Sequence, residues 1–394
     1  MRRPSLILER GKEKAVLRRH PWIFSGAVRR CDGSPQEGDI VDVRGADGKW
    51  LAAGHYQDDS IVCKVLSFDT PDVDPEKNPD FWRERVRRAI AYRRQLGLFS
   101  MEATNLFRLV HAEGDFLPGL VADLYNQVLV LQAHSVGMHR AFPLLAQLFS
   151  EELALKSVFD KSAATLPKGA CENGYIWGDE PAEWEVCEDG NKMIVNFFEG
   201  QKTGFFIDQR ENRHLLSTLA RGRRVLNCFG YTGGFSLSAL SGGAEYVETV
   251  DISKKAIGLC NRNVAMNFGP EARHKGVVAD VLQYLDTVSD QFDIIVLDPP
   301  AFAKNHRSLQ QGLKGYRNIN QKAMEKIRPG GLLFTFSCSQ AVSRGDFQTM
   351  CFTAAATAGR AVRIVRQLPH AADHPVSIYH PEGEYLKGLL LSVE

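Results

Sequence analysis

The sequence has no long apolar run, no paired-cysteine motif and almost no net charge, and each absence narrows the class of protein. A membrane helix needs about 20 consecutive apolar residues, and the apolar runs of this chain are much shorter. The eight cysteines form no CxxC pair and no His/Cys cluster at zinc spacing. We therefore expect no metal and no disulfide framework, and reduced thiols in a cytoplasmic protein. The opening MRRPSLILERGKEK lacks the apolar core of a signal peptide, so we expect no export.

The net charge of +1 conceals two basic clusters near the start of the chain. Before residue 31, nine basic residues stand against two glutamates: Arg2, Arg3, Arg10, Lys12, Lys14, Arg18, Arg19, Arg29 and Arg30 against Glu9 and Glu13. The segment FWRERVRRAIAYRR (81–94) adds six arginines. Such clusters are typical of a protein that binds a phosphate backbone. A solvated helix face explains the second cluster equally well, but the two together favour RNA or DNA as a partner.

The pattern along the 394 residues changes twice. Residues 1–70 contain short alternating segments between turn signals, such as DIVDVRG and WLAAGHY, which predict a small β-barrel. A linker with three prolines, DTPDVDPEKNPD, leads to an arginine-rich helix that begins near Phe81. Mixed strand and helix patterns then predict an α+β module that shows no catalytic constellation. We predict domains over residues 1–70, 71–189 and 190–394.

The last of these domains alternates apolar strand-like runs with helical stretches. The runs RVLNCF, YVETVD, FDIIVLDPP and GGLLFTFS are separated by helical patterns such as SKKAIGLCNRNVAMN. This alternation predicts an α/β fold with a parallel, doubly wound sheet. In such a sheet, ligands bind beyond the carboxyl ends of the strands, and the polar residues of interest all follow a strand.

A cofactor crevice is predicted at the first three strand ends. The first strand runs into NCFGYTGGF, whose glycines allow a tight turn close to a ligand, although the spacing is not GxGxxG. Asp251 follows the second strand, where a carboxylate accepts hydrogen bonds from ribose hydroxyls, and Asp280 follows the third, where adenine would lie. Either aspartate would also serve as a helix N-cap. The three ends together favour S-adenosylmethionine, which needs a ribose acid but no diphosphate cradle.

The fourth strand runs into the rigid turn DPPAF. Pro299 and Pro300 fix the backbone after Asp298, so the turn can aim this carboxylate and nearby carbonyls at a flat base. An aromatic residue directly after the prolines is typical of methylation at an exocyclic amine. Ala301 stands there and Phe302 follows it, which weakens the amine hypothesis.

The fifth strand ends in TFSCSQ, with Cys338 between Ser337 and Ser339. A small buried thiol is the usual role of a cysteine and explains Cys228 and Cys260. A polar trio at the catalytic edge favours a nucleophile instead. Thiolate attack on carbon 6 of a pyrimidine makes carbon 5 reactive towards a methyl sulfonium, and nearby polar or cationic groups must help to ionise the thiol.

These stretches together resemble the 23S ribosomal RNA large-subunit methyltransferase I family, whose members make 5-methylcytosine. The resemblance covers nearly the whole chain and includes HPWIFSGAV, KTGFFIDQRENR, NCFGYTGGFS, DPPAFAKN, GGLLFTFSCS and ADHPVSIYHPEGEYLKG. It implies a PUA RNA-binding barrel, an α+β middle domain and a Rossmann-like class I methyltransferase domain. It also implies ribosomal RNA as the partner and no membrane; the oligomeric state stays open, with a homodimer as one alternative.

Carried onto this chain, the resemblance implies a set of functional residues. The residues expected at S-adenosylmethionine are Phe205, Gln209, Arg213, Asn227, Phe229, Gly230, Tyr231, Thr232, Gly233, Asp251, Ile252, Ser253, Asp280, Val281 and Asp298. Asp298 would engage the target base and Cys338 would be the nucleophile. Pro300 stands where many other RNA cytosine-C5 enzymes carry a second cysteine, so the base that removes the carbon-5 proton is unassigned, with Asp298 or a water as our hypothesis.

The residues expected at the RNA are Pro299, Pro300, Phe302, Lys304, Arg317, Ser337 and His374. Lys304 and Arg317 would hold phosphates or would simply be solvated, and His374 would reach the pocket or be satisfied by loop backbone. The sequence thus predicts an RNA cytosine-C5 methyltransferase. The alternatives are methylation of another base position, such as guanine N7, and a non-catalytic RNA-binding assembly factor.

Overall fold

The computed structural model describes residues 3–289, 291–303 and 305–394, which form two compact units. The first unit contains the described residues up to Val186, together with Val195–Ile207 and Ala372–Gly383. The second contains Cys187–Ile194, Asp208–Ala371 and Glu384–Glu394. The division of the chain into three domains stays a prediction. In the part of the chain that the structure describes, no helix is long and apolar enough to cross a membrane.

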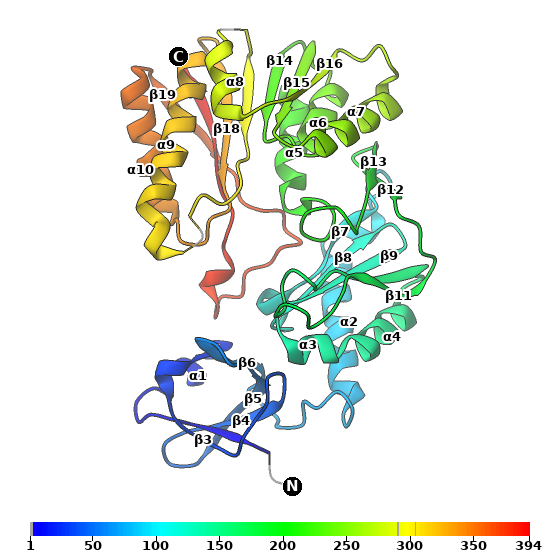
Figure 1. The fold of residues 1–394 in the computed structure, drawn as a ribbon, viewed down its shortest axis with the longest axis vertical. Helices are drawn as coiled ribbons and strands as arrows, with labels where there is room; N and C mark the ends of the chain where they lie inside the picture. The colour runs from blue at the N-terminus through cyan, green and yellow to red at the C-terminus, as the bar shows by residue number, and fades with distance from the viewer. Residues whose placement is uncertain (1–2, 290, 304) are drawn as a thin grey trace. The chain divides into compact units, whose positions relative to one another are not determined.

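The first unit opens with a mixed sheet in the order β2-β6-β5-β4-β1-β3 (Figure 1). Its strands are β1 (Ser5–Leu8), β2 (Trp22–Phe24), β3 (Val28–Asp32), β4 (Ile40–Arg44), β5 (Trp50–Tyr56) and β6 (Ile61–Ser67), with the short helix α1 (Lys14–Leu17) after β1. Alternate residues of these strands, such as Val41, Val43 and Val65, are buried in one cluster. The predicted β-rich start of the chain is therefore present.

The arginine-rich helix α2 (Pro79–Gln95) begins at a favourable cap, because Asn78 accepts a hydrogen bond from the Phe81 backbone N–H (3.2 Å) and proline occupies the first turn. The helix packs against a second sheet, of order β11-β10-β9-β8-β7. The elements of this layer are β7 (Leu106–His111), β8 (Leu120–Tyr125), β9 (Val128–Ala133), α3 (Val136–Arg140), α4 (Phe142–Glu152), β10 (Ser157–Asp160) and β11 (Gly174–Gly178). This is the α+β module that the sequence predicts.

The second unit contains a mainly parallel sheet of order β16-β15-β14-β17-β18-β20-β19. Its strands are β14 (Arg224–Cys228), β15 (Tyr246–Asp251), β16 (His274–Val278), β17 (Ile294–Leu297), β18 (Gly331–Ser337), β19 (Val362–Gln367) and β20 (Lys387–Val393). The first five in this order run parallel, whereas β20 is antiparallel to both β18 and β19. The hairpin of β12 (Trp184–Glu188) and β13 (Asn191–Val195) precedes this sheet.

Helices cover both faces of this sheet, as Figure 1 shows. They are α5 (Arg210–Leu219), α6 (Gly234–Ser241), α7 (Lys254–Phe268), α8 (Val281–Thr287), α9 (Leu309–Lys326) and α10 (Arg344–Ala358). Along β17, Ile294 and Val296 pack with α5 and α6, whereas Ile295 and Leu297 pack with α8, α9 and α10. This period of two, with both faces apolar, is typical of a doubly wound sheet and places loop residues at its carboxyl edge.

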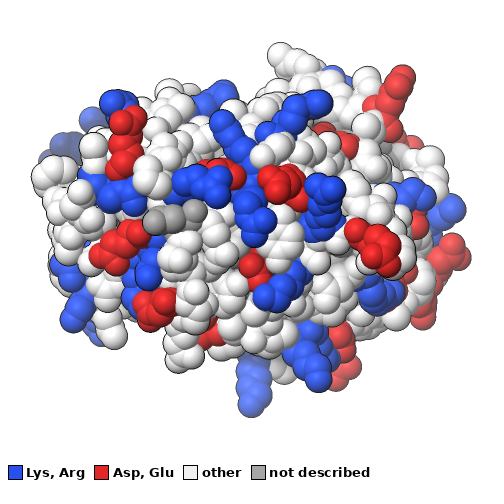
Figure 2. Space-filling view, turned by 90° about the horizontal axis from the view of Figure 1, so that it is seen from above, with Lys and Arg blue, Asp and Glu red and all other residues white. Residues whose placement is uncertain are grey.

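The surface charge is mixed where Figure 2 shows it. Lysine and arginine side chains lie among aspartate and glutamate side chains on this face, and neither sign forms a continuous field. This agrees with the near-neutral net charge of +1. The face drawn there is therefore unlike the broad basic surface that many nucleic-acid-binding proteins present.

Candidate active site

The loop after β14 has an unusual backbone. Phe229 (φ 57°) and Tyr231 (φ 46°) both lie in the left-handed region although neither is glycine. Such conformations cost about 1 kcal/mol or more each and are concentrated at functional sites. The loop ends at Gly233 (φ 89°), which caps helix α6. The predicted glycine-containing turn is therefore a strained strand-to-helix turn at the carboxyl edge of the sheet.

Two of the loop glycines lie against neighbouring elements. A Cβ atom on Gly230 would lie 2.3 Å from Cγ2 of Thr249 in β15. A Cβ atom on Gly233 would lie 2.5 Å from Sγ of Cys260 in α7. No ordinary side chain fits at either position, because real Cβ atoms do not approach other heavy atoms this closely.

Asp251, at the end of β15, fixes this loop. Its Oδ2 accepts a hydrogen bond from the Tyr231 N–H (3.0 Å), and its Oδ1 accepts one from the Ser253 N–H (2.8 Å). A carboxylate oxygen can accept more than one hydrogen bond, so both oxygens can still receive ribose hydroxyls. Ile252 beside it is 74% exposed and offers a flat apolar contact. Asp251 thus offers hydrogen-bond acceptors for a ribose, and Ile252 next to it offers an apolar surface for a base.

Asp280, at the end of β16, caps helix α8. Its side chain accepts a hydrogen bond from the Gln283 N–H (3.0 Å), and the carboxylate is exposed to solvent. The N-cap hypothesis is therefore correct for the protein alone, and an additional contact with adenine stays a prediction. Val281 is buried in the core behind this cap.

A network of buried, hydrogen-bonded side chains connects β14, α6, β15 and β16 next to this loop. Asn227 donates from Nδ2 to Oγ of Ser236 (2.9 Å). The same Ser236 Oγ lies 2.6 Å from Oγ1 of Thr249, and this Thr249 oxygen lies 2.7 Å from Nε2 of His274. Burial lowers the pKa of His274 to about 4, so its ring is neutral at pH 7. Asn227 is only 1% exposed. Asn227 therefore holds the turn in place through this network. Thr232 is also buried, and its carbonyl oxygen accepts a hydrogen bond from Nδ2 of Asn263 (3.1 Å).

Arg213 and Gln209 lie near the start of α5 in different surroundings. The Arg213 guanidinium binds both carboxylate oxygens of Glu188, at 2.5 Å and 2.7 Å, and both side chains are buried. The Gln209 Oε1 accepts from Asn212 (2.6 Å), whereas its buried Nε2 has no hydrogen-bond partner within the described residues. A buried N–H donor without a partner can donate a hydrogen bond to an acceptor atom of a ligand. Phe205 belongs to the first unit, where its N–H contacts the Tyr125 hydroxyl (3.2 Å).

Cys338 follows β18 and lies beside the turn that follows β17. Its partly buried Sγ is 3.9 Å from the carbonyl oxygen of Pro299. The two strands are parallel neighbours, with Leu297 opposite Thr335, so their carboxyl ends meet at one edge. Asp298 is also partly buried there, and Pro300 is exposed. The structure thus brings the predicted thiol to the Asp298 turn.

A hydroxyl pair holds this turn in place. The Ser339 Oγ accepts from the Ala303 N–H (3.1 Å) and lies 2.8 Å from the Tyr316 hydroxyl. The Tyr316 hydroxyl also accepts from the Phe302 N–H (3.3 Å), and the two rings pack with centroids 4.6 Å apart. Phe302 therefore packs on α9. Ser337, which is fully buried, accepts from the Ser339 N–H (3.3 Å).

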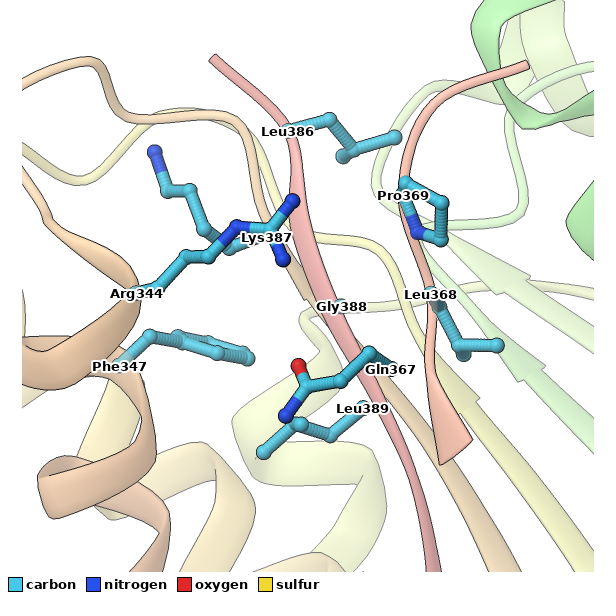
Figure 3. A pocket seen from close by; sticks show the side chains of 9 residues that line it. All are labelled: Arg344, Phe347, Gln367, Leu368, Pro369, Leu386, Lys387, Gly388 and Leu389. Carbon is cyan, nitrogen blue, oxygen red and sulfur yellow. The ribbon is translucent and has the colours of Figure 1, made fainter. Parts of the chain in front are cut away.

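Lys387, at the start of β20, was not predicted from the sequence. It lies opposite Ser337 in the antiparallel pair, is 5% exposed, and donates to the carbonyls of Ser339 (2.6 Å) and Tyr385 (2.7 Å). Burial lowers its pKa to about 8, and attraction to Cys338 acts in the opposite direction. Figure 3 shows its ammonium group pointing away from Leu389, which lines the same small pocket. The ammonium group therefore lies at the carbonyl of Ser339, the residue that follows Cys338.

The remaining predicted RNA contacts belong to different units or lie outside the described residues. Arg317, on α9, makes no ion pair with any of the residues that the structure describes. His374 belongs to the first unit, where it is buried between Asp373 (2.9 Å) and the ring of His111. Lys304 lies outside the described residues. These contacts with RNA stay predictions.

One cluster of metal-ligating side chains lies in the first unit. The ligand atoms of His139, Asp160 and Cys171 are all within 4.8 Å of one another. The His139 Nε2 is already bonded to the Asp160 carboxylate at 2.7 Å, which satisfies both groups without an ion. The expected absence of a metal stays a prediction.

Comparison with known proteins decides the family. The ribosomal RNA large subunit methyltransferase I of Aeromonas hydrophila is 39% identical, and the alignment covers 98% of both chains. That of Serratia proteamaculans is 38% identical over 98% of this chain and 99% of its own. The chain belongs to this family. Family models also match an S-adenosylmethionine-dependent methyltransferase over residues 157–378 and a PUA-like domain over residues 6–68.

Solved structures show the same fold at lower identity. SMU.776, a methyltransferase crystallised with SAH, has a TM-score of 0.84 and 21% identity, with 99% of this chain and 100% of that chain covered. An S-adenosylmethionine-dependent methyltransferase from Streptococcus mutans gives a TM-score of 0.84 and 20% identity over 99% and 100%. The predicted family, α/β fold class and cofactor are confirmed. The tight loop, the Asp251 oxygens and the unpaired Gln209 donor all fit S-adenosylmethionine.

Proposed function

We propose that this protein transfers a methyl group from S-adenosylmethionine to carbon 5 of a cytosine in large-subunit ribosomal RNA, through a covalent adduct with Cys338. The relatives' name supports ribosomal RNA as the substrate. The observation that supports the covalent route best is the Cys338 Sγ at 3.9 Å from the Pro299 carbonyl, beside Asp298. A thiol buried in the core could not reach a base.

The proposed reaction follows from what these side chains can do. The thiolate of Cys338 adds to carbon 6 of the extruded cytosine, and the displaced electron pair makes carbon 5 nucleophilic. When bound, S-adenosylmethionine supplies an electrophilic methyl group to that carbon. A base, Asp298 or a water, then removes the carbon-5 proton. The electron pair reforms the 5,6 double bond and expels the thiolate, so the free enzyme is restored.

The ammonium of Lys387 favours the charged form of the nucleophile. Attraction between the thiolate and this cation is strong in a partly buried site, because fewer water molecules screen it. Its bonds to two carbonyl oxygens hold the ammonium in place. In this proposal Lys387 acts through Cys338 and is a positioning residue.

The direct test replaces Cys338 with alanine and follows transfer of labelled methyl groups to ribosomal RNA. The covalent route predicts loss of transfer together with unchanged S-adenosylmethionine binding. RNA that carries 5-fluorocytosine should trap the wild-type protein, since fluorine cannot leave as a proton does. Full activity of Cys338→Ala would instead support methylation at another position, such as guanine N7. Absence of transfer by the wild-type protein would support the RNA-binding factor.

A further inference from the structure

The arginine-rich helix α2 is mostly neutralised within the protein. Its arginines pair with acidic residues of the same unit: Arg83 with Glu151, Arg87 with Glu152, Arg88 with Glu84, and Arg93 with Asp115. The pairs of Arg83, Arg87 and Arg93 join α2 to α4 and to the segment after β7, whereas the Arg88–Glu84 pair lies within α2. Most of the cluster that the sequence suggests for phosphate binding is therefore structural.

Arg85 is different from these arginines. No carboxylate of the described residues lies within ion-pairing distance of it, and its buried Nε has no hydrogen-bond partner. Its other nitrogens donate to the carbonyls of Leu66 (3.1 Å) and Phe81 (3.3 Å), and its guanidinium stacks 3.4 Å above the centre of the Phe81 ring. A half-buried cation with a spare donor favours an anionic ligand.

A cavity of about 280 Å³, partly open to solvent, lies at Arg85. Its lining combines arginines with the rings of Phe116, Phe68 and Tyr379. Of the arginines, Arg19 is paired with the lining carboxylate Asp69 (2.8 Å) and Arg88 with Glu84, and Glu113 also lines the cavity, so Arg85 is the lining arginine without a carboxylate partner among the described residues. Binding sites for small molecules have volumes of roughly 300–1,000 Å³ and combine apolar walls with a few polar groups. This cavity lies near the lower limit of that range, which suits one nucleotide better than a longer segment. The lining residues belong to the first unit.

The aromatic side of the cavity is exposed and strained. Phe116 is 59% exposed and has a left-handed backbone (φ 59°), and Tyr379 is 45% exposed. Packing does not explain a large aromatic ring at such a position, since glycine or asparagine would adopt this backbone more easily. Exposed rings beside arginines are the groups on which unpaired RNA bases stack.

We propose that this cavity binds an unpaired nucleotide of the RNA substrate, with the phosphate on Arg85 and the base against Phe116 and Tyr379. The inference rests on the proposed RNA function and adds a contact site outside the methyl-transfer centre. It explains together the unpaired guanidinium, the cavity and the strained ring. Electrostatic attraction alone would explain only the first.

The test measures binding of a labelled single-stranded RNA oligonucleotide to the full chain by fluorescence anisotropy, at one fixed salt concentration. Arg85→Gln should weaken binding much more than Arg87→Gln, a change of equal charge on the same helix at a residue already paired with Glu152 (2.6 Å). Equal losses in the two variants would overturn the proposal, because they would show a general charge effect.

A second variant tests the site even if Arg85→Gln does not fold. Phe116→Gly removes the ring and relieves the left-handed strain, so the melting temperature should be equal or higher while RNA binding falls roughly 5- to 150-fold. The control Phe352→Ala removes a ring that is 72% exposed on α10 and should leave binding unchanged. Unchanged RNA binding in Phe116→Gly would refute the site.

Competition identifies the ligand. A free mononucleotide or a phosphopeptide that displaced the RNA at equal concentration would overturn the assignment to an RNA segment. These measurements need neither cofactor nor methyl transfer. Failure of the cavity proposal would therefore leave the Cys338 experiment intact, and an active Cys338→Ala protein would leave the binding result intact.

Discussion

The ion pair between Arg213 and Glu188 gives the sharpest test of how the site is built. The sequence predicts Arg213 at the cofactor, whereas the structure shows its guanidinium bound to both Glu188 oxygens (2.5 Å and 2.7 Å), with side chains 3% and 4% exposed. Removal of one partner of a buried pair typically costs about 3–5 kcal/mol, because the other charge stays buried alone. We expect this loss for Arg213→Met.

The size of the effect separates the two roles. For domains of 150–250 residues, 1 kcal/mol shifts the melting temperature by about 2–4 °C, so Arg213→Met should lower the melting temperature of this unit by roughly 6–20 °C. The double variant Glu188→Leu, Arg213→Met should recover most of the loss, since no unpaired charge remains. Differential scanning calorimetry measures both shifts.

Calorimetric titration with S-adenosylmethionine, at a temperature where every variant is folded, completes the test. If Arg213 only positions α5, the double variant should bind S-adenosylmethionine nearly as well as the wild type. A melting temperature of Arg213→Met within about 2 °C of the wild type would refute the reasoning. So would a double variant that regains stability but not cofactor binding, since that result would make Arg213 a direct ligand.

Three further predictions concern the loop, the thiol and pH. Gly233→Ala should cost about 2–4 kcal/mol in urea unfolding, because its Cβ would lie 2.5 Å from Sγ of Cys260, whereas Gly190→Ala (φ 79°, nothing within 4 Å) should cost only about 1 kcal/mol; equal costs would contradict the clash. Lys387→Met should move the pH midpoint of Cys338 alkylation, followed by peptide mass spectrometry, to higher pH, and Lys387→Arg should not; identical midpoints in Lys387→Met and wild type would exclude the cation's role. The unfolding free energy should fall as pH drops from about 6.5 to 4, because burial lowers the pKa of several histidines in the folded state and the unfolded chain therefore binds protons first; a constant urea midpoint between pH 7 and 5 would contradict this. The histidines are His55 (about 3), His134 (about 4) and His274 (about 4).

The positions of the residues at the strand ends could be predicted from the sequence, because a parallel sheet brings the carboxyl ends of its strands to one edge. Asp251, Asp280, Asp298 and Cys338 each follow an apolar run, and the carboxyl ends of parallel strands share one edge. The structure places all four there. Local pattern and fold rules suffice for such positions, while the roles of these residues in binding and catalysis stay predictions.

The contacts that complete the site depend on distant partners. Lys387 reaches the Ser339 carbonyl across 48 residues, through an antiparallel strand that enters the sheet late in the chain. Arg213 meets Glu188 through a hairpin whose register the sequence does not reveal. For the same reason the spacing could not distinguish Arg85 from Arg83 and Arg87, since the partners of Arg83 and Arg87 lie on α4.

The arrangement at Asp251 has a consequence for how the enzyme finishes a cycle. Because backbone N–H groups of Tyr231 and Ser253 already order this carboxylate, a nucleoside would enter a rigid cradle. Methyl donor and demethylated product carry the same ribose, so such a cradle would hold both with similar strength. Release of the demethylated product would then depend on an interaction other than the one with the ribose, for instance on the loss of the positive sulfonium charge.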